Sequence, residues 1–117
     1  IRGDDVIQLT EDHTLVNWQI REGMLTPDEA ARSPHRNVIT RAVGNHDYVQ
    51  VDTQMVAVRI GDKFLICSDG LHGYVKRGEL GAIMAGDLEA ACDTLISLAI
   101  QRGGRDNITA VAIAVAD

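Results

Sequence analysis

The chain has 117 residues, of which 45% are hydrophobic and 3% aromatic, and its formal net charge is −6. This length favours one domain or part of one, with a core of aliphatic side chains. The acidic balance argues against a sequence-independent grip on nucleic acid and against docking on an anionic membrane, and no apolar run approaches the ~20 residues of a membrane-spanning helix.

The first residues predict a turn, a strand and a helix. Gly3–Asp5 has the composition of a turn, and the apolar residues within 6–9 predict the second strand of a hairpin. Residues 12–22 follow with helical periodicity, and Gly23 is a plausible stop. The strand that should precede the turn is almost absent, so we expect that the chain was cut from a longer one.

A second helix is predicted to begin with the capping box Thr26–Glu29, in which Thr is the N-cap, Pro follows it and Glu lies three residues on. Pro34 should end this helix early. Residues 36–44 mix apolar and polar side chains, which indicates a partly buried segment that ends at Gly44.

The middle of the chain predicts extended structure. Residues 49–52 and 55–60 are strand-like, and Gly61-Asp62 suits a two-residue turn of type II′, in which glycine comes first. Residues 63–68 form the returning strand. This strand is apolar on both faces, so we expect it to be central and covered on both sides.

The last third predicts two helices and a strand. Residues 76–84 favour a helix, and residues 88–102 carry an apolar stripe typical of a packed helix that ends at Gly103-Gly104. Residues 108–115 form a strand with branched side chains on one face and alanines on the other. The small alanine face suggests that a helix packs closely against it.

Taken in order, these elements predict an α+β fold with an antiparallel sheet. Cys67 and Cys92 lie in apolar runs and are interpreted as buried free thiols, which indicates a reducing, cytoplasmic environment. A disulfide between the two cysteines remains an alternative at this stage.

Two aspartates stand out by their positions. Asp69 directly follows the buried strand and precedes Gly70, and Asp106 precedes Asn107 in the loop between the long helix and the last strand. A carboxylate at the end of a rigid strand is held in a fixed position, as a metal ligand must be. Asn107 could orient the carboxylate of its neighbour, Asp106. The alternative is that Asp-Gly is only a turn and Gly-Gly only a helix cap.

Four stretches, in this order, carry a family resemblance: LTEDH at 9–13, RNVITRAVG at 36–44, LICSDGL at 65–71 and GGRDNIT at 103–109. Together they resemble the bacterial branch of the PP2C-type, metal-dependent serine/threonine protein phosphatases, over essentially the whole chain. The resemblance implies a sandwich of two antiparallel sheets flanked by helices. Residues 1–117 would be its C-terminal portion, without the N-terminal half.

The resemblance also implies the chemistry. The family holds two Mn²⁺ or Mg²⁺ ions, and its bacterial members often hold a third. Metal-bound water attacks the phosphorus of phosphoserine or phosphothreonine, so no side chain serves as the nucleophile. By motif match, Asp69 and Asp106 would bind a metal, with Gly70 and Asn107 in supporting roles. Asp12 would bind the third ion, and the alternative is an acidic residue in the first turn of a helix.

Residues 22–45 would form the family's flap-like segment beside the active site. Arg36 and Arg41 could contact a substrate phosphate, or they could pin this segment to the core. The implied partner is a phosphoprotein, such as a target of a serine/threonine kinase.

We expect residues 1–117 alone to be inactive, because the family's bridging aspartate and phosphate-binding arginine are not found here. The chain should then need its N-terminal half or an oligomer partner to cover an apolar sheet face. The competing hypothesis is a non-catalytic PP2C-like module that binds phosphoproteins or regulators.

Overall fold

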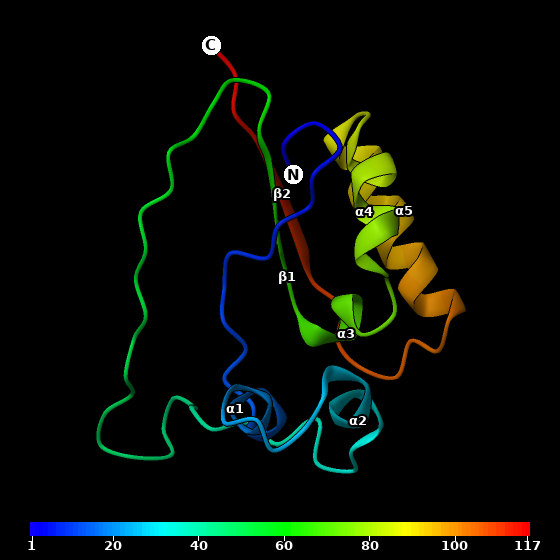
Figure 1. The fold of residues 1–117 in the computed structure, drawn as a ribbon. Helices are drawn as coiled ribbons and strands as arrows, with labels where there is room; N and C mark the ends of the chain where they lie inside the picture. The colour runs from blue at the N-terminus through cyan, green and yellow to red at the C-terminus, as the bar shows by residue number, and fades with distance from the viewer. The chain divides into compact units, whose positions relative to one another are not determined.

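A computed structural model describes residues 1–117, and it divides into two compact units. The first unit contains Ile1–Ile7 and Val56–Asp117, and the second contains Gln8–Met55. The elements, drawn in Figure 1, are in chain order α1 (Leu15–Arg21), α2 (Pro27–Arg32), β1 (Lys63–Cys67), α3 (Asp69–His72), α4 (Arg77–Met84), α5 (Leu88–Gln101) and β2 (Ala110–Ala114). None of the helices has both the length and the apolar character to cross a membrane.

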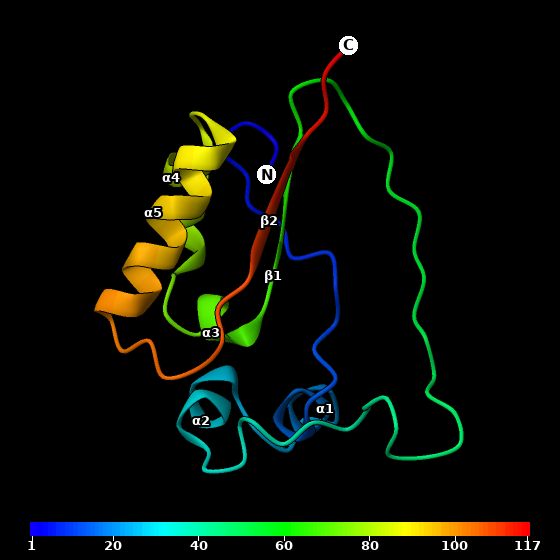
Figure 2. The same cartoon turned by 180° about the vertical axis from the view of Figure 1, so that it is seen from behind.

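The first unit is built on a two-stranded antiparallel sheet in which Leu65 of β1 lies opposite Ala112 of β2. Leu65 and Ala112 face a hydrophobic core, and α4 and α5 lie on the same side of the strands in Figures 1 and 2. The prediction that a helix packs on the alanine face is therefore confirmed. The prediction that β1 is covered on both sides is wrong, because Ile66 on the opposite face is 62% exposed.

The core of this unit lies between the sheet and α5. Leu95 and Ala99 of α5 are fully buried, as is Met84 at the end of α4. Both predicted helices are confirmed, and the Asp87 carboxylate caps α5 by accepting the N–H of Ala90 at 2.9 Å. The Lys63 side chain reaches the C-terminus of α4 and donates to three backbone carbonyls, those of Met84, Ala85 and Gly86.

The turn before β1 differs from the predicted type II′ hairpin turn. Asp62 N donates to Arg59 O at 3.0 Å, and Gly61 has φ +90°, so glycine occupies the third position, as in a type II turn. The Asp62 carboxylate is buried and accepts the backbone N–H of Arg59 and two guanidinium N–H groups of Arg2. Arg2 and the Arg59 amide hold the pKa of Asp62 well below its usual range. The same contacts hold the turn one residue earlier in the sequence than predicted.

The two helices of the second unit are capped by threonines. The capping box at α2 is confirmed, with Thr26 N donating to the Glu29 carboxylate at 2.8 Å and Glu29 N donating to Thr26 Oγ1 at 3.3 Å. The predicted start of the first helix at residue 12 is wrong. Thr14 is the N-cap of α1 because its hydroxyl accepts the N–H of Asn17, and Gly23 follows the helix with φ +73°.

Several predicted strands do not form. Residues 6–9, 49–52 and 55–60 pair with no neighbouring strand, and only an isolated bridge between Arg2 and Asp5 closes the first turn. The prediction that 36–44 is partly buried holds only at Arg41 and Ala42. A strand needs a partner for its backbone groups, and these segments have none, although much of 49–60 runs extended in Figure 1.

The two cysteines are free, as predicted, but they are half-buried and not fully buried. Burial raises the pKa of the Cys67 thiol, which keeps it protonated and unreactive at neutral pH.

Candidate metal centre

Asp69 is held where β1 passes into α3. It is the first residue of this one-turn helix, and Ser68 is the N-cap, with φ −79° and ψ 166°. The N–H of Gly73 donates to Asp69 O at 3.0 Å, so the backbone of the aspartate is fixed by the turn that follows it. The Asp69 side chain is exposed and makes no ion pair within the chain.

Asp106 is presented by the loop that follows α5. The helix ends in the hydrogen-bond pattern of a Schellman motif, with Gly103 N donating to Ile100 O and Gly104 N donating to Ala99 O. Gly104 has φ +51°, a conformation that glycine adopts without strain. The loop then turns back toward β2, and Asp106 Oδ1 accepts the N–H of Asn107 at 2.7 Å.

Three hydrogen bonds join the two aspartate segments through Ser68. Its backbone N–H donates to Thr109 O at 3.1 Å, and its hydroxyl accepts the Thr109 N–H at 3.0 Å and donates to Asn107 O at 3.2 Å. Sequence analysis did not single out Ser68. The only available signal was its place between the buried strand and Asp69.

Gly70 brings the same segments into direct contact. A Cβ added to this buried glycine would lie 2.2 Å from the carbonyl oxygen of Asn107 and 3.4 Å from Cβ of Asp106. The structure therefore places the backbones beside Asp69 and Asp106 together. Asn107 takes part through its backbone, because its carbonyl oxygen lies against Gly70 and its N–H donates to Asp106 Oδ1.

The donor chemistry fits a hard divalent cation only in part. Two exposed carboxylates on adjoining loops are the oxygen ligands that Mg²⁺ and Mn²⁺ prefer. No group of three or more His, Cys, Asp or Glu side chains is arranged to hold a metal ion. Water, substrate oxygens or further protein groups would have to complete the coordination of an ion at Asp69 and Asp106.

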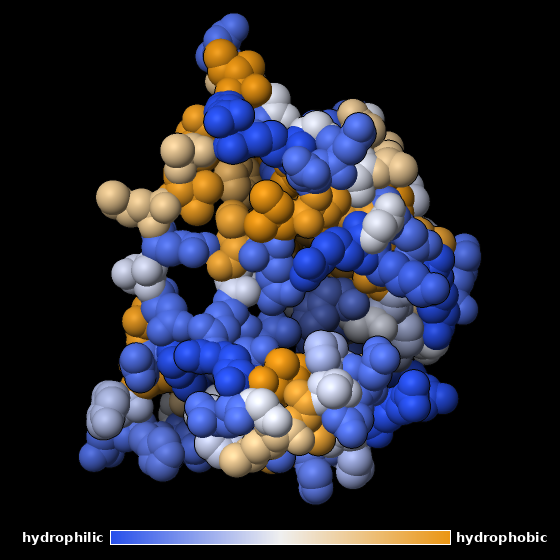
Figure 3. Space-filling view, viewed as in Figure 1, coloured by the Kyte–Doolittle hydropathy of each residue, from blue (hydrophilic) through white to orange (hydrophobic).

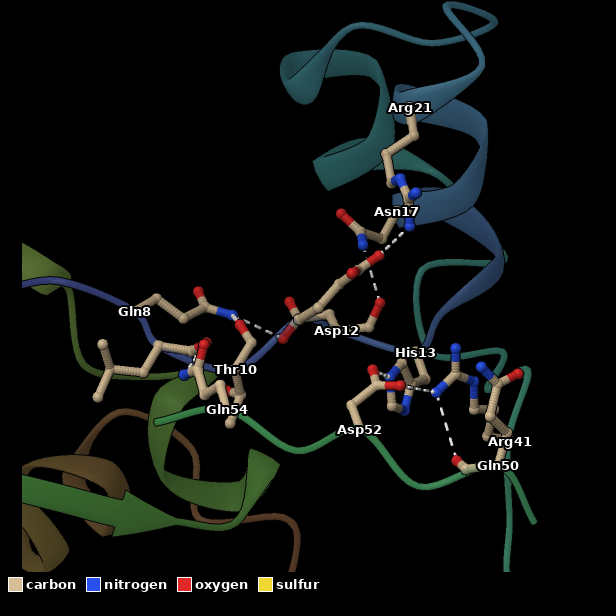
Figure 4. A network of polar contacts seen from close by, with 12 residues as sticks. Gln8, Thr10, Asp12, His13, Asn17, Arg21, Arg41, Gln50, Asp52 and Gln54 are labelled. Carbon is tan, nitrogen blue, oxygen red and sulfur yellow. Dashed lines mark hydrogen bonds and ion pairs between the residues drawn. The ribbon is translucent and has the colours of Figure 1, made fainter. Parts of the chain in front are cut away.

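Asp12 belongs to the second unit, and it is shown with its neighbours in Figure 4. Its carboxylate accepts from Gln8 Nε2 at 2.9 Å, and its backbone carbonyl accepts from Asn17 Nδ2 at 2.9 Å. The alternative that Asp12 is an acidic residue in a helix's first turn is wrong, because α1 begins at Leu15. The exposed carboxylate keeps free lone pairs, but nothing in the second unit adds a further acidic ligand to make a metal site.

Arg41 and Arg36 differ in their surroundings. The Arg41 guanidinium forms an ion pair with Asp52 at 2.7 Å and donates to Gln50 O at 3.3 Å, while His13 Nε2 lies 2.7 Å from the same Asp52 carboxylate (Figure 4). The Arg41 hydrogen bond, followed by that of His13, lowers the pKa of Asp52. Arg41 is therefore already paired, which favours the interpretation that it pins its segment.

Arg36 is exposed, and its guanidinium donates only a long hydrogen bond of 3.4 Å, to the carbonyl of Ser33. Of the two arginines, it is the one whose guanidinium remains open to a ligand. Sequence analysis missed Asp52 because the aspartate lies eleven positions beyond Arg41, outside any local motif.

No protein-family model matches the sequence. The protein phosphatase PhpP of Streptococcus pneumoniae is 39% identical over 117 residues, which cover 98% of this chain and 48% of PhpP. Among solved structures, the serine/threonine phosphatase Stp1 from Staphylococcus aureus has a TM-score of 0.91 at 34% identity, over 100% of this chain and 47% of Stp1. The phosphatase PstP/Ppp of Mycobacterium tuberculosis has a TM-score of 0.89 at 34% identity, over 99% and 49% of the two chains.

In sequence and in fold, the chain is similar over nearly all of its length to bacterial serine/threonine phosphatases. Its homologues are bacterial serine/threonine phosphatases of the PP2C type, and the chain spans about half the length of the relatives that it matches. The α+β prediction is confirmed, and the match is consistent with the predicted C-terminal half. Within the described residues, only one sheet of the implied two-sheet sandwich is present.

Proposed function

We propose that this chain contributes one side of the active site of a phosphatase that removes phosphate from phosphoserine and phosphothreonine in proteins. The observation that carries the proposal is the junction of Ser68 and Gly70 with Asn107, which holds Asp69 beside Asp106. Neither carboxylate forms an ion pair with another side chain of the chain, which leaves both open to a cation.

Asp69 and Asp106 are the residues that would hold Mn²⁺ or Mg²⁺. A structure of the PstP catalytic domain, with a TM-score of 0.81 at 33% identity to this chain, is in complex with two manganese ions, which supports a metal-dependent assignment. When bound, such ions supply an activated water and stabilise charge on the phosphoryl oxygens. The chain itself would hold the two carboxylates in place: β1 and α3 position Asp69, and the end of α5 positions Asp106.

The remaining site residues receive weaker support. Asp12 is proposed as a ligand of a third ion because its carboxylate is exposed and accepts a hydrogen bond from the neutral Gln8 side chain, not from a cation. Arg36 is proposed as a phosphate contact because its guanidinium is exposed. Arg41 is proposed to pin the flap-like segment 22–45 to the segment around Asp52.

The proposed partner is a protein phosphorylated by a serine/threonine kinase. The proposed location is the cytoplasm, where the free thiols of Cys67 and Cys92 would persist. A second candidate is a PP2C-like module that binds phosphoproteins or regulators without turnover. It is favoured by the absence of a three-ligand metal cluster within the described residues.

The proposed function is tested by phosphatase assay of the purified chain with p-nitrophenyl phosphate and a phosphothreonine peptide in millimolar Mn²⁺. An EDTA control and the variant Asp69→Asn accompany it. Activity that is lost in both controls would mean that the chain assembles a working centre, for example across an oligomer. If the chain is inactive alone, the N-terminal half of a relative's domain is added in trans. Metal-dependent activity then supports a split enzyme, and binding without turnover supports the module.

A further inference from the structure

Ser68 uses its hydroxyl in an unusual way for a residue at the start of a helix. A serine at an N-cap ordinarily accepts a backbone N–H of the helix's first turn. The Ser68 side chain makes no such bond to α3, and only its backbone carbonyl accepts from Leu71 and His72. The hydroxyl points instead to the loop that carries Asp106.

The hydroxyl completes a clamp on that loop. It accepts the N–H of Thr109 at 3.0 Å and donates to the carbonyl of Asn107 at 3.2 Å, so both of its hydrogen-bonding functions are satisfied by the backbone across from it. Gly70 lies against the same Asn107 carbonyl, which a Cβ on residue 70 would meet at 2.2 Å. Both sequence neighbours of Asp69 therefore contact the Asn107 carbonyl: the Ser68 hydroxyl donates to it, and Gly70 packs against it.

The position of these contacts relative to the carboxylates gives them a role beyond stability. Ser68 and Gly70 are the two neighbours of Asp69, and Asn107 is the neighbour of Asp106. Neither carboxylate is oriented by a cation or by a hydrogen bond from the opposite loop. The separation of the two carboxylates therefore depends on the backbone junction and on the hydroxyl that closes it.

We propose that Ser68 is a positioning residue that sets the separation of Asp69 and Asp106, so that one divalent ion can contact both carboxylates. This inference rests on the proposed metal site. The Ser68 hydroxyl does not touch the ion in this assignment and acts only through the backbone of residues 107–109. Groups that orient metal ligands in this way typically contribute about 10- to 100-fold in metal affinity.

The test is a Mn²⁺ titration of the ¹⁵N-labelled chain, followed by paramagnetic broadening of backbone amide signals, with Mg²⁺ as the diamagnetic reference. In the wild-type chain, the amides around residue 69 and those around residue 106 should broaden together at the same Mn²⁺ concentration. Ser68→Ala should require about 10-fold more Mn²⁺ for the same broadening of both groups of amides. Ser68→Thr, which keeps the hydroxyl, should remain close to the wild-type value.

The matched control is Thr94→Ala, which removes a hydroxyl that donates to Ala90 O within α5, away from the aspartate loops. Its titration should follow the wild type. If the wild-type amides show no broadening near either aspartate, the proposed metal site itself fails, and the inference fails with it. If the wild type broadens as expected and Ser68→Ala titrates unchanged, or shifts no more than Thr94→Ala, only the inference is overturned.

Circular dichroism on each variant separates misfolding from a local effect. If Ser68→Ala does not fold, Ser68→Thr decides the question. Broadening of this variant at the wild-type Mn²⁺ concentration supports the hydroxyl's role, and a folded Ser68→Thr variant that requires about 10-fold more Mn²⁺ contradicts it.

Discussion

The carbonyl oxygen of Asn107 lies so close to Gly70 that a methyl group at residue 70 would stand 2.2 Å from it. The obstacle is backbone, which cannot rotate aside as the end of a flexible side chain can. Glycine is therefore required at this position by the approach of two chain segments, and not by an unusual φ value, since none of the positive-φ glycines is Gly70.

The first prediction follows from this contact. Gly70→Ala should lower the free energy of unfolding by about 1–3 kcal/mol, as expected for overpacking at a rigid site, and it should weaken Mn²⁺ binding at Asp69 and Asp106. Urea unfolding and Mn²⁺ titration measure the two effects.

The matched control is Gly78→Ala, at an exposed glycine in α4 whose added Cβ would meet no atom within 4 Å. It should stabilise the chain by about 0.5–1 kcal/mol. Equal effects of the two substitutions would contradict the prediction.

The contrast between Gly70 and the capping box shows which features the sequence could predict. The capping box at Thr26, the apolar stripe of α5 and the alanine face of β2 depend on residues that are close in sequence, so their patterns predicted them. The bond from Ser68 to Asn107 joins residues 39 positions apart, and no local pattern encodes it. Asp69 and Asp106 could be named from their motifs, but their juxtaposition could not be derived from spacing.

The predicted strands that do not form were overpredicted from local composition. Residues 49–60 have the composition of strands, but composition predicts only an extended backbone and does not supply a neighbour to pair with. The turn at Gly61 was displaced by the contacts of Asp62 with Arg2, which are again distant in sequence. The Asp52 partner of Arg41 was missed for the same reason.

The second prediction concerns acid stability. Arg102, followed by the backbone N–H of Lys76, lowers the pKa of Glu79 from 4.5 to about 2. The Glu79–Arg102 ion pair links α4 to the end of α5 at 2.7 Å. Because the folded-state pKa is the lower one, this pair contributes its full stability above the unfolded pKa and loses it as pH falls toward the folded value.

The unfolding free energy of the wild type should therefore fall between about pH 6 and pH 3, and Glu79→Gln should show a smaller fall over the same range. Urea titrations at the two pH values measure it. Glu89→Gln is the control, because Glu89 is an exposed residue of α5 without an ion pair. If Glu79→Gln and the wild type lose the same amount of stability, the ion pair does not carry this dependence.

The third prediction tests the pinning role of Arg41. Asp52→Asn removes the anionic partner of Arg41 and His13, so the segment around Tyr48, whose side chain is 80% exposed, should open more often. Exposed ion pairs contribute only modestly to stability, so chymotryptic cleavage after Tyr48 should rise by up to about fivefold. Asp47→Asn changes an acidic residue of the same segment that has no ion pair, and it should be cleaved at the wild-type rate. A Tyr48 cleavage rate unchanged in Asp52→Asn would argue that this network does not hold the segment.

The fourth prediction concerns the outer face of the sheet. Ile66 lies directly opposite Val111, and Phe64 directly opposite Ile113, on the side of β1 and β2 turned away from the core. Ile66 is 62% exposed, Val111 48% and Ile113 44%, and apolar surface is visible over the strand region in Figure 3. A contiguous apolar face without charges is a surface that associates with a complementary one.

The chain alone should therefore self-associate at tens of micromolar, which light scattering after size exclusion measures. The double variant Ile66→Thr, Val111→Thr should shift the distribution toward monomer, because it replaces the centre of the face with hydroxyl-bearing residues of high strand propensity. Val43→Thr changes an apolar residue that is 92% exposed but lies outside the sheet, and it should leave the distribution unchanged. A monomeric wild-type chain would contradict self-association. Addition of a relative's N-terminal half should then be examined, because a heterologous complex that the double variant abolishes would identify the same face as its contact.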